Sequence, residues 1–188
     1  MTSQLRPATR AVIAGFIGLN LLGLTVLLGI VRERDGLLPA AKAFLAASNQ
    51  ATEVTTCLQG ARDELFVPGQ GELRTQVAVD AALTRLRQCD ITALRRSLAA
   101  VDLPPAAPVS DADRRHARAS IAEGLAALQR VVLDATGADE AMSANLQGAP
   151  NGLYIILAYR SAAAGSVTAA ADAQEALAVL GHPQSTVG

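Results

Sequence analysis

Two cysteines are the residues whose chemistry is most specific in this chain. Cys57 and Cys89 are the only cysteines, and paired thiols in an exported domain often form a disulfide. A turn near residues 66–71 would place Cys57 level with Asp80, so that Cys89 would lie about 13 Å further along its helix, at 1.5 Å per residue. A disulfide requires Cα atoms within about 7 Å. A kink near Cys89, or a different turn, would remove this mismatch, so the sequence leaves the bonded and the free state equally open.

The remaining reactive residue types give no catalytic, cofactor or metal pattern. His116 lies among arginines, off the apolar face of its predicted helix, and His182 lies in the C-terminal tail. Gly69-Gln70-Gly71 is typical of a turn, because no Gly-Lys-Ser/Thr of a phosphate loop follows it. No nucleophile elbow, CxxC motif or zinc-ligand spacing is present in the sequence. We therefore expect a non-enzymatic protein without a cofactor.

One single arginine and one set of five arginines could have structural or surface roles. Arg160 interrupts a predicted apolar stripe of Ile156, Ala163, Val167 and Ala170. It could form an ion pair with Asp80, contact a ligand carboxylate, or extend to the surface. The set of five would gather at the membrane-proximal end, where it would form either a lipid-facing basic collar or a solvated mixed-charge face. This set comprises Arg95, Arg96, Arg114, Arg115 and Arg118.

A membrane helix is the strongest prediction from the sequence. Residues 11–31 carry no charge, and a helix of this length spans about 30 Å, the thickness of the hydrocarbon core. The run is longer than the apolar region of a signal peptide, and charged residues follow it directly, so we expect an uncleaved anchor. Lys and Arg are almost balanced across the span, and the amino terminus favours a cytoplasmic N-terminus. The domain that follows is then periplasmic, in the inner membrane of a bacterium, an origin that the arginine-rich, lysine-poor composition also favours.

One face of this span is predicted to contact other membrane helices. Small residues recur on it every three or four positions, which allows close approach of a second helix. Asn20 lies on roughly the opposite side and needs a hydrogen-bond partner in mid-membrane. Ordinary glycine usage, with Asn20 bonded to its own backbone, is the alternative explanation. The predicted packing residues are Ala11, Gly15, Gly18, Asn20, Thr25 and Gly29.

The rest of the chain is expected to be all-α. Apolar residues make up 51% and aromatic residues only 3%, and the abundant alanine and leucine favour helices. Gly36 and Pro39 should interrupt the first helix. Apolar stripes then predict four helices in an antiparallel bundle, with the third opened by Ser110 and Asp113 and closed by Gly137, and a short helical turn within 138–150. The stripe of the first of these helices is Ala40, Phe44, Ala47, Ala51, Val54, Leu58, Ala61 and Leu65, and that of the third is Ala117, Ile121, Gly124, Leu128, Val131 and Ala135. The sequence divides into a cytoplasmic tail (1–10), a transmembrane helix (11–32), a juxtamembrane linker (33–39), an extracytoplasmic bundle (40–181) and a C-terminal tail (182–188).

Two functions fit this organisation. The first is an accessory or assembly subunit of a larger membrane protein complex of photosynthetic, respiratory or secretion type, in contact with other subunits and the lipid bilayer. The net charge of −1 argues against a nucleic-acid partner. The alternative is a sensor or ligand-binding module, because a span followed by an exported four-helix bundle resembles chemoreceptor sensor domains in architecture only. Such receptors also need a second span and an output domain, neither of which the sequence up to Gly188 predicts.

Overall fold

Helices account for the regular structure of this chain. The computed structural model describes the backbone of residues 7–65, 76–145 and 152–181, and the side chains of these ranges except 7–17, 144 and 145. Within these residues there are helices and no strands, which confirms the all-α prediction. The turn expected at Gly69–Gly71 and the tail with His182 lie outside the described residues. The helices are α1 (Pro7–Asp63), α2 (Gln76–Gln88), α3 (Ile91–Ala99), α4 (Ala112–Asn145) and α5 (Leu153–Gly181).

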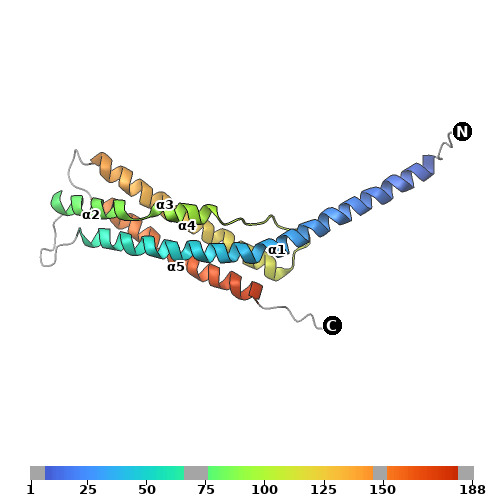
Figure 1. The fold of residues 1–188 in the computed structure, drawn as a ribbon. Helices are drawn as coiled ribbons and strands as arrows, with labels where there is room; N and C mark the ends of the chain where they lie inside the picture. Colours follow the sequence, from blue (N-terminus) through green and yellow to red (C-terminus); the bar gives the residue numbers. More distant parts are fainter. Residues whose placement is uncertain (1–6, 66–75, 146–151, 182–188) are drawn as a thin grey trace.

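The helices form a bundle from which the first part of α1 projects (Figure 1). The second part of α1 runs the length of the bundle, with α2 and α3 returning beside it. α4 and α5 then complete the bundle, and α5 packs against both α4 and α1. Within the bundle α1 and α4 run away from the arm and α2, α3 and α5 run back toward it, so that the end of α5 returns toward the projecting arm (Figure 1). We call α1 up to residue 32 the arm.

The predicted interruption at Gly36 and Pro39 is wrong, because α1 continues through both residues. Proline lacks the backbone N–H that would bond to the carbonyl one turn earlier, so inside a helix it can bend the helix without ending it. Pro39 lies exposed, while Ala40 and Ala41 beside it are buried in the bundle. The helix changes direction where the arm leaves the bundle (Figure 1).

The predicted second helix is broken into α2 and α3 by a corner at Cys89 and Asp90. The side chain of Asp90 caps α3 by accepting a hydrogen bond from the backbone N–H of Ala93 at 2.7 Å. An aspartate at this position satisfies one of the amide groups that a helix leaves unpaired at its start. The corner matters for the disulfide described below.

The third predicted helix has different ends from those expected. α4 is capped by Asp111, whose carboxylate accepts from the backbone N–H of Arg114 at 2.8 Å, so Ser110 is not the capping residue. At the other end, α4 continues past Gly137 to Asn145, which also removes the separate helical turn expected within 138–150. A glycine inside a helix costs only about 1 kcal/mol, and the buried Ala138 and Met142 extend the packing beyond it.

An alanine-rich core holds the bundle together. The predicted stripes of α1 and α4 are buried, so those faces are confirmed. The stripe predicted for α5 is wrong: Val167 is exposed, and the buried face lies on neighbouring positions. Buried stripe residues are Ala40, Phe44, Ala47, Ala51, Val54, Leu58, Ala61 and Leu65 of the first helix and its end, Ala117, Ile121, Leu128, Val131 and Ala135 of α4, and Ile155, Ala158, Ala162, Ser166, Ala169, Ala173 and Ala176 of α5.

Glycines let α5 pack closely against α4, and α4 closely against α1. A Cβ atom built on Gly165 would lie 2.7 Å from Cγ2 of Val131, and one built on Gly124 would lie 2.2 Å from Cζ of Phe44. Phe44 is fully buried. The missing side chain at Gly124 therefore provides the space into which the ring of Phe44 packs.

Candidate functional site

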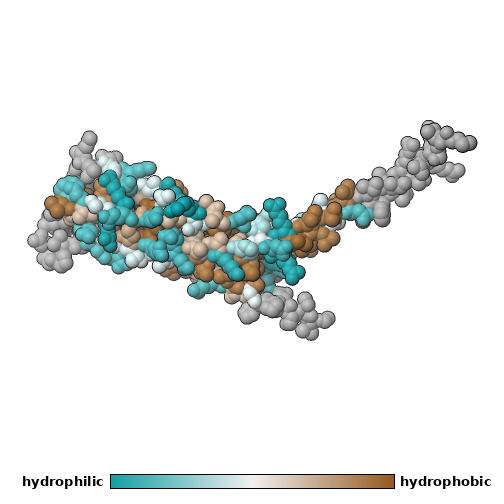
Figure 2. Space-filling model, in the orientation of Figure 1, coloured by the Kyte–Doolittle hydropathy of each residue, from teal (hydrophilic) through white to brown (hydrophobic). Residues whose placement is uncertain are grey.

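Large apolar side chains cover the described part of the arm. Leu19, Leu22 and Leu27 are 79%, 69% and 61% exposed, and Leu21, Leu24, Leu28 and Val31 are exposed as well. At 100° per residue these positions point to every side of the helix, a pattern typical of helices in an apolar environment. In Figure 2 this apolar stretch meets a hydrophilic band where α1 enters the bundle.

Hydropathy selects a different helix as a candidate span. Among the described residues, α5 is the helix whose length and mean hydropathy of 1.2 would allow it to cross a membrane. Its buried face packs against α4 and α1, but only 28% of its most apolar stretch is buried, so burial accounts for only part of its apolar character. The predicted span at residues 11–32 extends beyond the described side chains and stays a prediction.

The small-residue face of the arm is open in part and covered in part. A Cβ built on Gly18 would meet nothing within 4 Å, and Thr25 donates a hydrogen bond to the backbone carbonyl of Leu22 at 2.9 Å. Gly29 is different, because its Cβ position lies 3.7 Å from Cδ of Pro108 in the same chain. The surroundings of Ala11 and Gly15 lie outside the described side chains. A partner helix that packs on this face would therefore contact the part that lies on the N-terminal side of Gly29.

Asn20 is on the opposite side of the arm and is exposed in the isolated chain. A polar amide in the middle of an apolar helix is costly in hydrocarbon unless it has a hydrogen-bond partner. Its position fits either a local bond or a neighbouring membrane helix.

A buried carboxyl group marks the base of the arm. Glu33 is 1% exposed, and its Oε1 accepts a hydrogen bond from the hydroxyl of Ser110 at 3.1 Å. Its Oε2 is buried without a hydrogen-bond partner among the described residues. This contact joins α1 to the start of α4. The sequence did not predict this contact, because Glu33 lies in a run of charged residues after the apolar stretch and its partner Ser110 is 77 residues away.

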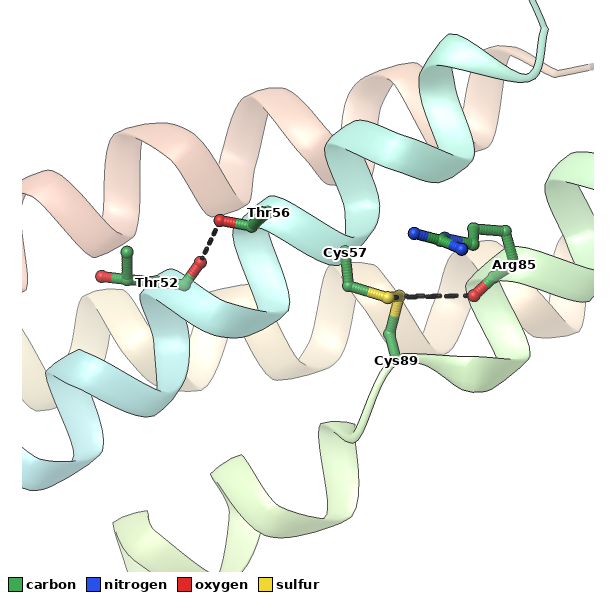
Figure 3. The surroundings of a disulfide bond; sticks show 5 residues. All are labelled: Thr52, Thr56, Cys57, Arg85 and Cys89. Atoms are coloured by element: carbon green, nitrogen blue, oxygen red, sulfur yellow. Dashed lines mark hydrogen bonds between the residues drawn. A yellow bond between two sulfur atoms is a disulfide. The ribbon is translucent and has the colours of Figure 1, made fainter.

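The structure brings Cys57 and Cys89 together as a disulfide, with Cα atoms 5.6 Å apart. Cys57 lies on α1, and Cys89 lies at the corner that follows α2 (Figure 3). The expected mismatch of register does not arise, because α1 ends at Asp63 and α2 begins only at Gln76. The connection is longer than the turn assumed at 66–71, so α2 is shifted along α1.

Arg160 and Asp80 are not brought together. Arg160 is exposed on α5, and Asp80 is on α2, where it accepts from the side chain of Gln76 at 2.8 Å. α2 packs against α1 and α4. Of the three alternatives for Arg160, the structure shows extension to the surface and not the ion pair with Asp80. Arg160 looked as if it could be buried because the predicted stripe of α5 lies on a different face from the buried one.

The five arginines do not form one collar. The guanidinium of Arg95 donates to the hydroxyl of Thr136 at 2.8 Å, and Thr136 lies about 33 Å along α4 from Arg114, at 1.5 Å per residue. Arg96 follows Arg95 on α3 and lies equally far away. Arg114, Arg115 and Arg118 remain at the start of α4, where Arg114 pairs with Asp111 at 3.4 Å. The collar prediction failed because α3 ends at Ala99 and an irregular segment covers the remaining distance.

Acidic side chains gather between α4 and α5. Burial, with the negative charges of Glu123 and Glu175, raises the pKa of the Asp172 carboxyl, and its Oδ2 is buried without a hydrogen-bond partner among the described residues. Glu175 in turn bonds His116 at 2.8 Å. The ionised form of Asp172 is therefore less favourable in the folded protein than in the unfolded chain.

Replacing Asp172 with asparagine is expected to raise the melting temperature at neutral pH. A carboxyl whose pKa is higher in the folded than in the unfolded state stabilises the fold below its unfolded pKa of about 3.9. That stabilisation is lost as the pH rises through the folded value. The gain from Asp172→Asn should therefore be largest near neutral pH and shrink as the pH falls toward 4, as followed by thermal unfolding. Glu140→Gln, an exposed change on α4, is the control and should give no such trend. An equal gain at all pH values would contradict the assignment.

A shallow groove lies between the distal halves of α4 and α5. It encloses about 420 Å³ and is open along one side. The exposed Leu133, Tyr154 and Leu157 line it, and Asp134, also in its wall, accepts from the hydroxyl of Ser161. Small-molecule sites usually bury most of their ligand, so this groove offers a sensor function only limited support.

Metal chemistry and homology add no further assignment. The described residues contain no group of three or more His, Cys, Asp or Glu side chains that could hold a metal ion. No family model, curated protein or solved structure matches the chain.

Proposed function

We propose that this chain is a non-enzymatic accessory or assembly subunit of a larger bacterial membrane protein complex. Its arm would anchor it in the inner membrane, with the N-terminus in the cytoplasm and the helical bundle in the periplasm. The observation that carries this proposal is the arm itself, on which leucines are exposed on all sides of a helix that continues directly into the bundle. Exposed apolar surface of this extent is costly in water and favourable in lipid.

The disulfide supports a location outside the cytoplasm. Disulfides persist in the periplasm and are rare in the reducing cytoplasm, and Cys57–Cys89 lies in the bundle and not in the arm. A reporter that is active only in the periplasm, fused after Gly188, should be active. Activity of a cytoplasmic reporter at the same position would reverse the topology.

The part of the small-residue face on the N-terminal side of Gly29 is proposed to contact a partner subunit. Gly18 and Gly23 both have open space where a side chain would project, so leucine at either position leaves the chain's own packing intact. They point in directions about 140° apart, and only Gly18 belongs to the small-residue face. This makes Gly23→Leu a matched control for Gly18→Leu.

Gly18→Leu is expected to reduce co-purification of partner subunits in mild detergent, with membrane insertion unchanged. A leucine on this face would separate the two helix backbones and weaken their contact. Gly23→Leu should retain the partners. Loss with Gly23→Leu alone would assign the contact to the side that carries Asn20. Full retention by both variants would mean that the arm is a plain anchor.

The sensor alternative ranks second. It would use the α4–α5 groove, and that groove is open and mostly apolar. Substituting Leu157 with arginine would block the groove, and a sensor would then lose its ligand response while a subunit held through the arm would keep its partners.

A further inference from the structure

The connection between α3 and α4 lies along the base of the arm. Its residues 103–110 carry no charge. Cγ of Pro104 is 3.1 Å from the Cβ position of Gly36, and Cδ of Pro108 is 3.7 Å from that of Gly29. The segment therefore follows α1 toward its N-terminus over seven residues, or about 10 Å.

The tip of this segment, residues 105–109, reaches the level of the uncharged part of α1. Gly29 belongs to the uncharged run 11–31, and it precedes Arg32 by about 4.5 Å along the helix. Pro108 is therefore at a depth where α1 itself presents only uncharged side chains. The polar contact of Glu33 with Ser110 and the pair of Asp111 with Arg114 lie immediately behind the tip.

The side chains of residues 104–109 divide into a buried and an exposed group. Pro104 and Ala107 are buried against the protein. Pro105, Ala106, Pro108 and Val109 are exposed, with Val109 67% exposed. The outward surface of the tip is thus apolar, although none of the residues that the structure describes covers it.

The backbone of the tip suits the boundary between lipid head groups and hydrocarbon. Irregular backbone is excluded from the hydrocarbon core because its N–H and C=O groups lack partners there. Prolines 104, 105 and 108 remove three of these N–H groups. Shallow insertion at the interface is therefore compatible with an irregular segment, whereas deep insertion is not.

We propose that residues 105–109 form a second membrane contact, a shallow apolar wedge that enters the lipid interface beside the arm. The partner is the bilayer leaflet on the side of the bundle. The continuity of this surface with the apolar arm and the charged residues directly behind it select lipid as the occupant. This inference rests on the proposed anchoring role of the arm.

Single tryptophans can test this directly, because the chain contains none. Three variants of the full chain serve as reporters: Val109→Trp at the tip, Leu22→Trp in the arm and Val77→Trp at the exposed start of α2. Each is reconstituted in phosphatidylcholine vesicles with and without brominated acyl chains, which quench nearby tryptophan. Ala106→Trp provides a second reporter in the tip should Val109→Trp fold poorly.

We expect strong quenching for Leu22→Trp, none for Val77→Trp, and an intermediate loss with a blue-shifted emission for Val109→Trp. Quenching at the tip should be greater with bromine near the carbonyl end of the chain than near the methyl end. Quenching of Leu22→Trp without quenching of Val109→Trp would overturn the wedge alone. Shielding of Val109→Trp from aqueous iodide without quenching by lipid would overturn lipid as the occupant. No quenching of Leu22→Trp would overturn the proposed anchor, and the wedge with it.

Discussion

Replacing both Cys57 and Cys89 with alanine is expected to lower the free energy of unfolding by about 3.5 kcal/mol. The bond joins residues separated by 32 positions. A cross-link over a loop of this length lowers the conformational entropy of the unfolded chain, which raises the free energy of the unfolded state by about this amount. It also holds the corner between α2 and α3 against α1. The measurement is urea unfolding of the full chain in detergent, followed by circular dichroism.

Reduction provides the matched control. The native protein in excess reductant should unfold at the urea midpoint of the double alanine variant, and that variant should not respond to reductant. A native midpoint unchanged by complete reduction would show that the disulfide contributes nothing to stability. A response of the double variant would show that the reductant acts elsewhere.

Gly124→Ala is expected to destabilise the bundle by about 1–3 kcal/mol through overpacking. The new methyl group would lie 2.2 Å from Cζ and 3.0 Å from Cε1 of Phe44, and 3.1 Å from Oδ2 of Asp172. Because Phe44 is fully buried, its ring could make room for the methyl group only by displacing other side chains of the core. Thermal unfolding should therefore show a lower melting temperature.

Gly137→Ala is the control on the same helix. A Cβ at Gly137 meets nothing within 4 Å, so only the helix propensity changes, and alanine should stabilise by about 0.5–1 kcal/mol. Phe44→Leu should partly relieve the effect of Gly124→Ala, because neighbouring substitutions are not additive. Equal effects at Gly124 and Gly137 would contradict the close packing of Phe44 on α4.

The sequence was sufficient to predict the buried face of a helix where apolar and polar residues alternate with a helical period. In α1 and α4, large residues such as Phe44, Leu58 and Ile121 stand out from polar neighbours, and their stripes are buried as predicted. In α5, alanines occur on every side of the helix, so periodicity could not separate Ala162, which is buried, from Ala163, which is half-buried, and Ala164, which is exposed. The misplaced stripe is the reason why an ion pair of Arg160 with Asp80 was considered beside the surface position that the structure shows.

Contacts that depend on the path of a connecting segment could not be predicted. The alignment of Cys57 with Cys89 required the length of the α1–α2 connection and the corner at Asp90. The position of Pro108 beside Gly29 required the α3–α4 segment to run back along α1. Gly29 was read as part of a surface for other helices, since sequence spacing alone shows that a side chain is missing and not which neighbour uses the space.

The continuity of α1 has a mechanical consequence. Beyond residue 32, α1 extends for about 46 Å to Asp63, at 1.5 Å per residue, without a hinge made of loop. Transmembrane helices change their tilt with the thickness of the bilayer. A tilt of about 10° in the lipid would carry the far end of such a rod by roughly 8 Å. With the arm in the membrane as proposed, it would act as a lever, through which membrane thickness sets the height and direction of the distal end of the bundle.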